Sequence, residues 1–84
     1  MKFEWDQGNR PKCEKRIPIA RIERFLASHR YVVFPDPFPL EDRFDAVGHD
    51  EDGRGMFIAF MIHDTGVIRV ISARYMHKEE IDDY

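Results

Sequence analysis

The residues best suited to act on an anionic substrate lie in the C-terminal third of this sequence, where 68–77 reads Ile-Arg-Val-Ile-Ser-Ala-Arg-Tyr-Met-His. The guanidinium groups of Arg69 and Arg74 can hold a phosphate and offset charge that develops on it. His77 supplies a group that titrates near neutral pH, and Tyr75 has a ring that can stack on a base. The imidazole of His77 can take a proton from a ribose 2′-hydroxyl or give one to a leaving oxygen. The combination suits cleavage of an RNA backbone.

A second group of candidates lies near the N-terminus, where Lys12, Lys15 and Arg16 follow one another closely. Lys12 could contact phosphate, and Lys15 or Arg16 could lie beside the scissile bond. The net charge of −3 argues mildly against a simple nucleic-acid binder. The first 30 residues nevertheless carry eight Lys/Arg against four acids, whereas the remainder carries five against twelve. A basic surface can therefore persist locally, because charges further apart than about 8–10 Å are screened at cellular salt.

Each candidate also has a purely structural interpretation. Arg69 could form a cross-strand ion pair with Asp45. His77 could be a core or capping residue, since it falls on the inward stripe of a final helix. Tyr75 and Tyr84 could close the edge of the core, and the basic N-terminal residues could be a solvated helix face.

Length and composition restrict the class of protein. The 84 residues suffice for one domain, 1–84, and 43% hydrophobic with 35% charged residues is typical of neither disordered nor membrane-spanning chains. The longest apolar run, 56–62, is too short to cross a bilayer, and the N-terminus lacks an apolar signal stretch. A cytoplasmic protein is expected. Cys13, the one cysteine, is expected to be a small buried residue, and no metal or cofactor is expected.

The first half of the chain predicts a short strand and two helices. Residues 3–5 alternate as a strand does, and Pro11 suits the first turn of a short helix that ends near 15 or 16. A second helix is predicted over 18–30. Its apolar stripe consists of Ile19, Ile22, Phe25, Leu26 and His29. Residues 31–34 look extended, and the prolines that follow favour a surface loop over 35–42.

The second half predicts three strands joined by tight turns, over 43–49, 56–63 and 67–73, and a helix over 76–83. The middle run is apolar at nearly every position, so we expect it to be central with both faces covered. On the third strand, simple alternation places Arg69 on one face and Ser72 and Arg74 on the other. The order indicates an α+β fold, in which helices pack on one face of a small antiparallel sheet of three main strands plus the short first one.

Taken together, these segments resemble the BrnT family of bacterial type II toxins. The similar segments are Phe3-Glu4-Trp5-Asp6, Lys12-Cys13-Glu14-Lys15, Asp36-Pro37, Arg43 to Val47-Gly48, Ile68 to Arg74, Glu80 and Tyr84. They occur in order over nearly the whole chain. The last strand segment is the most specific of them.

The resemblance implies a RelE-like fold and a metal-independent ribonuclease that inhibits translation. It also implies a BrnA-like antitoxin with a ribbon-helix-helix part that binds DNA, in a two-plus-two assembly, so that the toxin itself makes no direct DNA contact. The positions that match the family pattern are Lys15, Arg69, Ser72, Arg74, Glu80 and Tyr84. Of these, Ser72, Glu80 and Tyr84 are expected to help bind substrate, together with Lys12 and Tyr75.

One position departs from the family pattern. Members commonly read Lys-His-Gly after the first helix, whereas this chain reads Lys15-Arg16-Ile17. Arginine keeps the positive charge but cannot exchange protons at neutral pH. Either His77 takes over that task, or the protein is a catalytically weakened binding module that acts with a DNA-binding antitoxin in transcriptional autoregulation.

Overall fold

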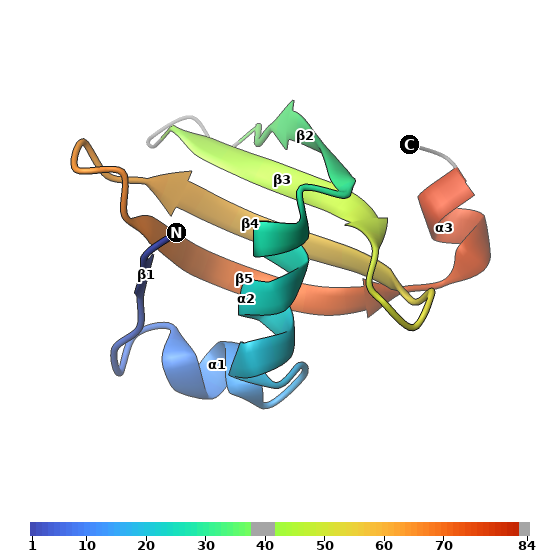
Figure 1. The fold of residues 1–84 in the computed structure, drawn as a ribbon, viewed down its shortest axis with the longest axis horizontal. Coiled ribbons are helices and arrows are strands. Elements are labelled where there is room, and N and C mark those ends of the chain that lie inside the picture. Colours follow the sequence, from blue (N-terminus) through green and yellow to red (C-terminus); the bar gives the residue numbers. More distant parts are fainter. Residues whose placement is uncertain (38–41, 83–84) are drawn as a thin grey trace.

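Five strands form one mixed sheet in the order β1-β5-β4-β3-β2 in this computed structural model, which describes residues 1–37 and 42–82, except the side chains of Lys78 and Ile81 (Figure 1). The strands are β1 (Phe3–Glu4), β2 (Tyr31–Pro35), β3 (Arg43–His49), β4 (Gly55–Ile62) and β5 (Ile68–Met76). β1 runs parallel to β5, and the other neighbours are antiparallel. The predicted α+β class and the central position of β4 are confirmed. The predicted sheet was one strand short, because the extended segment after the second helix pairs along β3 as β2.

Three helices accompany the sheet: α1 (Arg10–Glu14), α2 (Ile19–Ser28) and α3 (Lys78–Asp82). α2 lies across one face of the sheet, as Figure 1 shows, and buries Ile22, Phe25 and Leu26 against it. α1 contributes Cys13, which is fully buried in the same core, as the sequence predicts. Burial raises the pKa of the Cys13 thiol, since the charged thiolate is disfavoured away from water. No described helix is long and apolar enough to cross a membrane.

The buried side chain of Asn9 connects the N-terminal segment to the last strand, β5. The amide of Asn9, only 2% exposed, donates to the main-chain oxygens of Glu4 and Val70. Its own oxygen accepts the main-chain N–H of Asp6 at 2.8 Å. A buried amide must satisfy its hydrogen bonds. Asn9 therefore fixes the turn between β1 and α1 relative to β5.

A β-bulge in β5 changes which side chains share a face. Ala59 pairs with Ser72 and Phe60 with Val70, so Ile71 is the extra residue. One extra residue reverses the alternation beyond it. Ser72 therefore lies on the same face as Arg69, and so does Arg74 further along the strand. The prediction that Ser72 and Arg74 face away from Arg69 was wrong for this reason.

Two further predictions about exposed and covered residues were wrong. His29 ends α2 with a left-handed φ of 56° and is exposed, so the apolar stripe stops at Leu26. The second face of β4 carries no described helix, and Phe57 and Met61 on that face are only partly buried. The apolar run in β4 thus has one covered and one open face.

Candidate functional site

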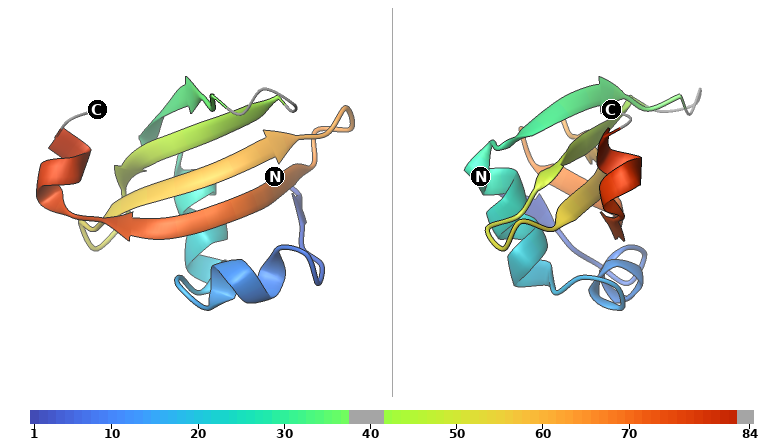
Figure 2. Two further views of the ribbon diagram at one scale, coloured as in Figure 1. Left: turned by 180° about the vertical axis from the view of Figure 1, so that it is seen from behind. Right: turned by 90° about the vertical axis from the view of Figure 1, so that its right-hand side faces the viewer.

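The face of the sheet opposite α2 is open, and Figure 2 (left) looks directly onto it without a described helix crossing it. The strand registers arrange its side chains in three rows across the sheet. The rows are Arg43–Met61–Arg69, then Phe34–Asp45–Ala59–Ser72, then Val32–Val47–Phe57–Arg74. We call this surface the open face. It carries polar and charged side chains above an apolar floor, so it can receive a chain with both charges and bases.

Arg74 lies at the α3 end of the open face. Its Nη1 donates to Glu80 Oε2 at 2.8 Å, and the main-chain N–H of His77 donates to the other oxygen, Oε1, at 3.3 Å. The guanidinium carbon lies 5.0 Å from the centre of the Phe57 ring. The hydrogen bond from Arg74 lowers the pKa of Glu80, which is therefore ionised at neutral pH. The structure thus brings Arg74, His77 and Glu80 together, and we call them the Arg74 cluster.

His77 does not occupy an inward helical stripe, contrary to that structural interpretation. It precedes α3 and is exposed. Its side chain is therefore open to solvent, while its main-chain N–H is the group that belongs to the Arg74 cluster. Tyr84 lies outside the described residues.

Arg69 lies on the open face at the opposite end of β5 and is held by two carboxylates. Its Nη1 donates to Glu4 Oε1 and Asp6 Oδ2, both at 2.8 Å, and its Nη2 to Asp6 Oδ1 at 3.1 Å. His63 Nε2 is 3.1 Å from Glu4 Oε1. These hydrogen bonds from Arg69 lower the pKa values of Glu4 and Asp6 and raise that of Arg69 itself.

The expected ion pair between Arg69 and Asp45 was wrong, because β4 separates their strands. Asp45 lies on β3 and is only 8% exposed. Burial, and then a hydrogen bond with Asp36, raise the pKa of Asp45 to about 6. Its Oδ1 has no hydrogen-bond partner in the described part of the chain. Asp45 is thus a carboxyl group that can change its charge near neutral pH.

Tyr75 faces the other side of the sheet from Arg74, because adjacent strand residues alternate. The guanidinium carbon of Arg54 lies 4.9 Å from the centre of its ring. The structure therefore does not place Tyr75 in the Arg74 cluster, although both belong to the end of β5. Tyr75 instead packs against the core, as its structural interpretation expects.

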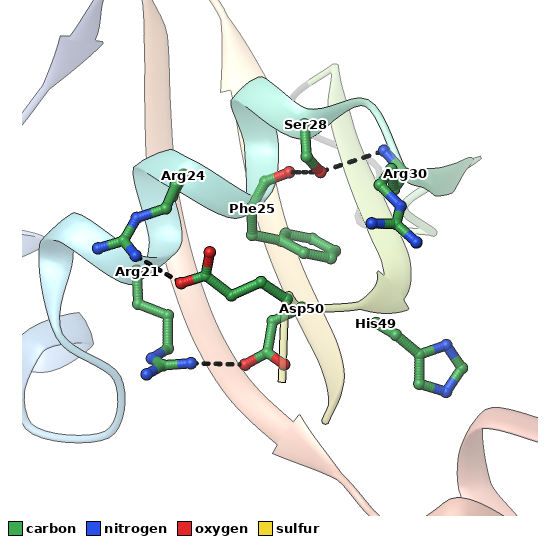
Figure 3. Close-up of a pocket in the computed structure, with 8 residues that line it drawn as sticks. Arg21, Arg24, Phe25, Ser28, Arg30, His49 and Asp50 are labelled. Atoms are coloured by element: carbon green, nitrogen blue, oxygen red, sulfur yellow. Dashed lines mark hydrogen bonds and ion pairs between the residues drawn. The ribbon is translucent and has the colours of Figure 1, made fainter. Parts of the chain in front are cut away.

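A pocket of about 190 Å³ lies between the end of α2 and the turn after β3 (Figure 3). Arg21 donates to Asp50 at 3.0 Å and to Asp52 at 2.6 Å, and Arg24 pairs with Glu51. These carboxylates neutralise the two arginines. Arg30 also lines the pocket and has no described carboxylate partner, so the pocket keeps one cation, but it is lined by α2 and lies outside the open face.

Lys12, Lys15 and Arg16 are exposed on α1 and the turn that follows it. In the described part of the chain, no ion pair or hydrogen bond joins their side chains to Arg69 or Arg74. Their position leaves them accessible to a phosphate, but not as part of the Arg74 cluster.

Sequence reasoning missed the carboxylates that hold Arg69. Glu4 alternates with Phe3 and Trp5, whose side chains pack against the core, so it had to face the other way. That signal was present in the sequence. The parallel pairing that sets Glu4 beside Arg69 was not, since it depends on where the first strand joins the sheet.

The geometry defines a small α+β protein with arginines on an uncovered sheet face. The family model described as "Ribonuclease toxin, BrnT, of type II toxin-antitoxin system" matches residues 5–80. The chain therefore belongs to the BrnT family and is a ribonuclease toxin of a type II toxin-antitoxin system, which confirms the resemblance seen in the sequence. A toxin of this kind has a cognate antitoxin as its partner. Searches of curated proteins and of solved structures found no significant match.

Proposed function

We propose that the chain cleaves RNA on its open face, at the Arg74 cluster. The observation that carries this proposal is the bulge at Ile71, which sets Arg74 and Ser72 on the face that α2 leaves free. RNA recognition commonly uses a sheet surface on which bases and phosphates lie together. Phe57, beneath Arg74, supplies the apolar part of such a surface.

Arg74 is a better phosphate ligand than Arg69 for an electrostatic reason. Arg74 has one carboxylate partner and a side chain that is 39% exposed, whereas Arg69 is 23% exposed and bonded to two carboxylates. Arg69 with Glu4 and Asp6 carries a net negative charge, which opposes a phosphate. Arg69 therefore acts as a positioning residue that holds the N-terminal segment against β5. A phosphate can replace Glu80 on Arg74, because both offer two oxygens to the guanidinium fork.

His77 is the proposed proton-transfer group. The 2′-hydroxyl oxygen attacks the adjacent phosphorus and breaks its bond to the 5′-oxygen of the next nucleotide. The imidazole takes the hydroxyl proton, water protonates the leaving 5′-oxygen, and a 2′,3′-cyclic phosphate remains, while Arg74 offsets charge on the phosphate. Ser72 offers a hydrogen bond, and Lys12, Lys15 and Arg16 contact phosphates further along the strand. This scheme involves the chain's own side chains and no metal ion.

The test is RNA cleavage by the purified protein in EDTA, with Arg74→Ala compared with Arg24→Ala. Arg24 forms an exposed ion pair with Glu51, so the control loses the same charge and an equivalent pair. Loss of one group that stabilises the transition state costs about 10²–10³-fold in rate. We expect a loss of this size only for Arg74→Ala. Equal rates in the two variants would refute the assignment.

We further propose that the antitoxin is BrnA-like, with a ribbon-helix-helix part that binds DNA in a two-plus-two complex, and that both act in the cytoplasm. Family membership supports this partner. Growth should stop when the toxin is expressed alone, because cleaved RNA cannot be translated. Growth should resume when the neighbouring gene is supplied. If the neighbouring product forms no complex with this chain, the proposed partner is wrong.

A catalytically weakened binding module is the second candidate. Arg16 replaces the family's histidine, and two carboxylates already hold Arg69. This function predicts intact RNA in the cleavage assay, together with an antitoxin complex whose DNA affinity depends on the toxin. The two candidates are thus separated by one RNA gel and one DNA-binding titration.

A further inference from the structure

β2 is an outer strand of the sheet, and its outer edge has no neighbour among the described elements (Figure 1). Val32 and Val33 at its middle are 54% and 47% exposed. Proteins usually protect such an edge with lysine, a bulge, an inward-pointing charge or a covering segment. In β2 the only such feature is Pro35, at the last position. The edge is therefore competent to pair with another strand.

The hydrogen bonds between β2 and β3 determine which backbone groups of β2 point outward. The N–H of Asp36 donates to the Arg43 oxygen at 2.9 Å, so position 36 points toward β3. Orientation alternates along an antiparallel strand. Tyr31, Val33 and Pro35 consequently direct their backbone groups outward. Proline has no N–H, so Pro35 leaves no unpaired donor at this edge. The edge therefore offers two N–H donors, those of Tyr31 and Val33, and three carbonyl acceptors.

We propose that a second copy of this chain docks on this edge, with β2 antiparallel to its equivalent and the two-fold axis at Val33. Each Val33 N–H then donates to the Val33 oxygen of the second copy. Each Tyr31 N–H likewise donates to the Pro35 oxygen of the second copy. Val32 lies opposite Phe34 on the open face, so apolar side chains meet there. The edge is thus complementary to itself, as a two-fold interface must be.

Charge complementarity supports the same register. Position 30 lies opposite position 36, so Arg30 of each copy comes beside Asp36 of the other. Arg30 is exposed and forms no ion pair with a described residue, and Figure 3 shows its guanidinium beside the pocket without a carboxylate. Asp36 lies beside Asp45, so the proposed contact brings a second cation toward two carboxylates that Arg43 already faces.

The dimer leaves the Arg74 cluster free, because β3 and β4 separate β2 from β5. Two five-residue strands form a small interface, below the roughly 1,200 Å² of stable complexes. The association should therefore be weak and dependent on concentration. It does not depend on whether the protein cleaves RNA.

The test is sedimentation of the full chain, without antitoxin, from low micromolar to millimolar concentration. We expect a monomer–dimer equilibrium that Val33→Lys abolishes. Ile62→Lys is the matched control, since Ile62 is 50% exposed but lies on β4, and it should dimerise normally. Arg30→Asp should weaken the dimer about tenfold through like charges. Adding Asp36→Arg should restore it.

Amide hydrogen exchange gives a residue-specific readout. The Tyr31 and Val33 amides should exchange quickly when dilute and become protected as the dimer forms, whereas Val32 and Phe34 should be protected throughout. A chain that stays monomeric at every concentration overturns the proposal. So does protection of Tyr31 and Val33 only after antitoxin is added, which would assign the edge to the antitoxin.

Discussion

Replacing Asp45 by asparagine should stabilise the protein, and the effect should depend on pH. Asp45 is 8% exposed, and its Oδ1 finds no described partner. Burial, and then the hydrogen bond with Asp36, raise its pKa from 3.8 to about 6. The unfolded chain therefore loses this proton more readily than the native one. The free energy of unfolding falls as pH rises from about 4 to 6, and the loss is complete above 6.

The size of the effect follows from the same pKa. One pKa unit corresponds to about 1.4 kcal/mol, so ionisation of Asp45 costs up to about 3 kcal/mol at pH above 7. Asparagine has nearly the same shape but carries no charge. Asp45→Asn should therefore gain most of this free energy at pH 7.5 and little at pH 4.

Urea unfolding of the wild type and Asp45→Asn across this pH range measures the difference directly. Asp64→Asn is the control, because Asp64 is an exposed residue of the turn between β4 and β5. Its stability should follow the wild type at every pH. Parallel pH profiles for wild type and Asp45→Asn would refute the reasoning, since the buried charge would then have no energetic consequence.

Other perturbations test the contacts that shape the sheet. Arg69→Met should lower Tm by about 5 °C at pH 7. The loss of Tm should shrink as pH falls through the lowered pKa values of Glu4 and Asp6. Thermal unfolding followed by circular dichroism would check both expectations. An unchanged Tm would mean that these ion pairs do not hold the N-terminal segment. Gly48→Ala should destabilise the fold by about 1–3 kcal/mol in urea, because a Cβ there would lie 2.5 Å from the Arg30 oxygen. Wild-type stability in that variant would show that β2 can shift freely.

The helices and the three main strands could be predicted because each rests on a local pattern of apolar and turn residues, and the family could be predicted because short characteristic segments recur along the chain. The apolar stripe of α2 and the apolar run of β4 are such patterns. The faces of β5 were not predictable in this way. The bulge at Ile71 has no glycine or other local signal, yet it determines that Arg74 shares a face with Arg69.

The ion-pair partners of the charged residues could not be predicted from the sequence pattern either. The pairing of β1 with β5 sets Glu4 beside Arg69, and the strand order keeps Asp45 away from it. Both depend on contacts between distant segments. Candidate site residues could therefore be named from their chemistry, whereas their grouping into an Arg74 cluster and a neutralised Arg69 depends on the folded structure.

Binding of RNA to the open face at the Arg74 cluster can be followed through the backbone amide resonances of the protein. The ligand is a short RNA with 2′-deoxy nucleotides, which lacks the attacking hydroxyl and is titrated into the protein. We expect the largest changes at Phe57, Ser72, Arg74 and His77, and little change along α2. Changes confined to α2 and its pocket, with β4 and β5 unaffected, would contradict this expectation.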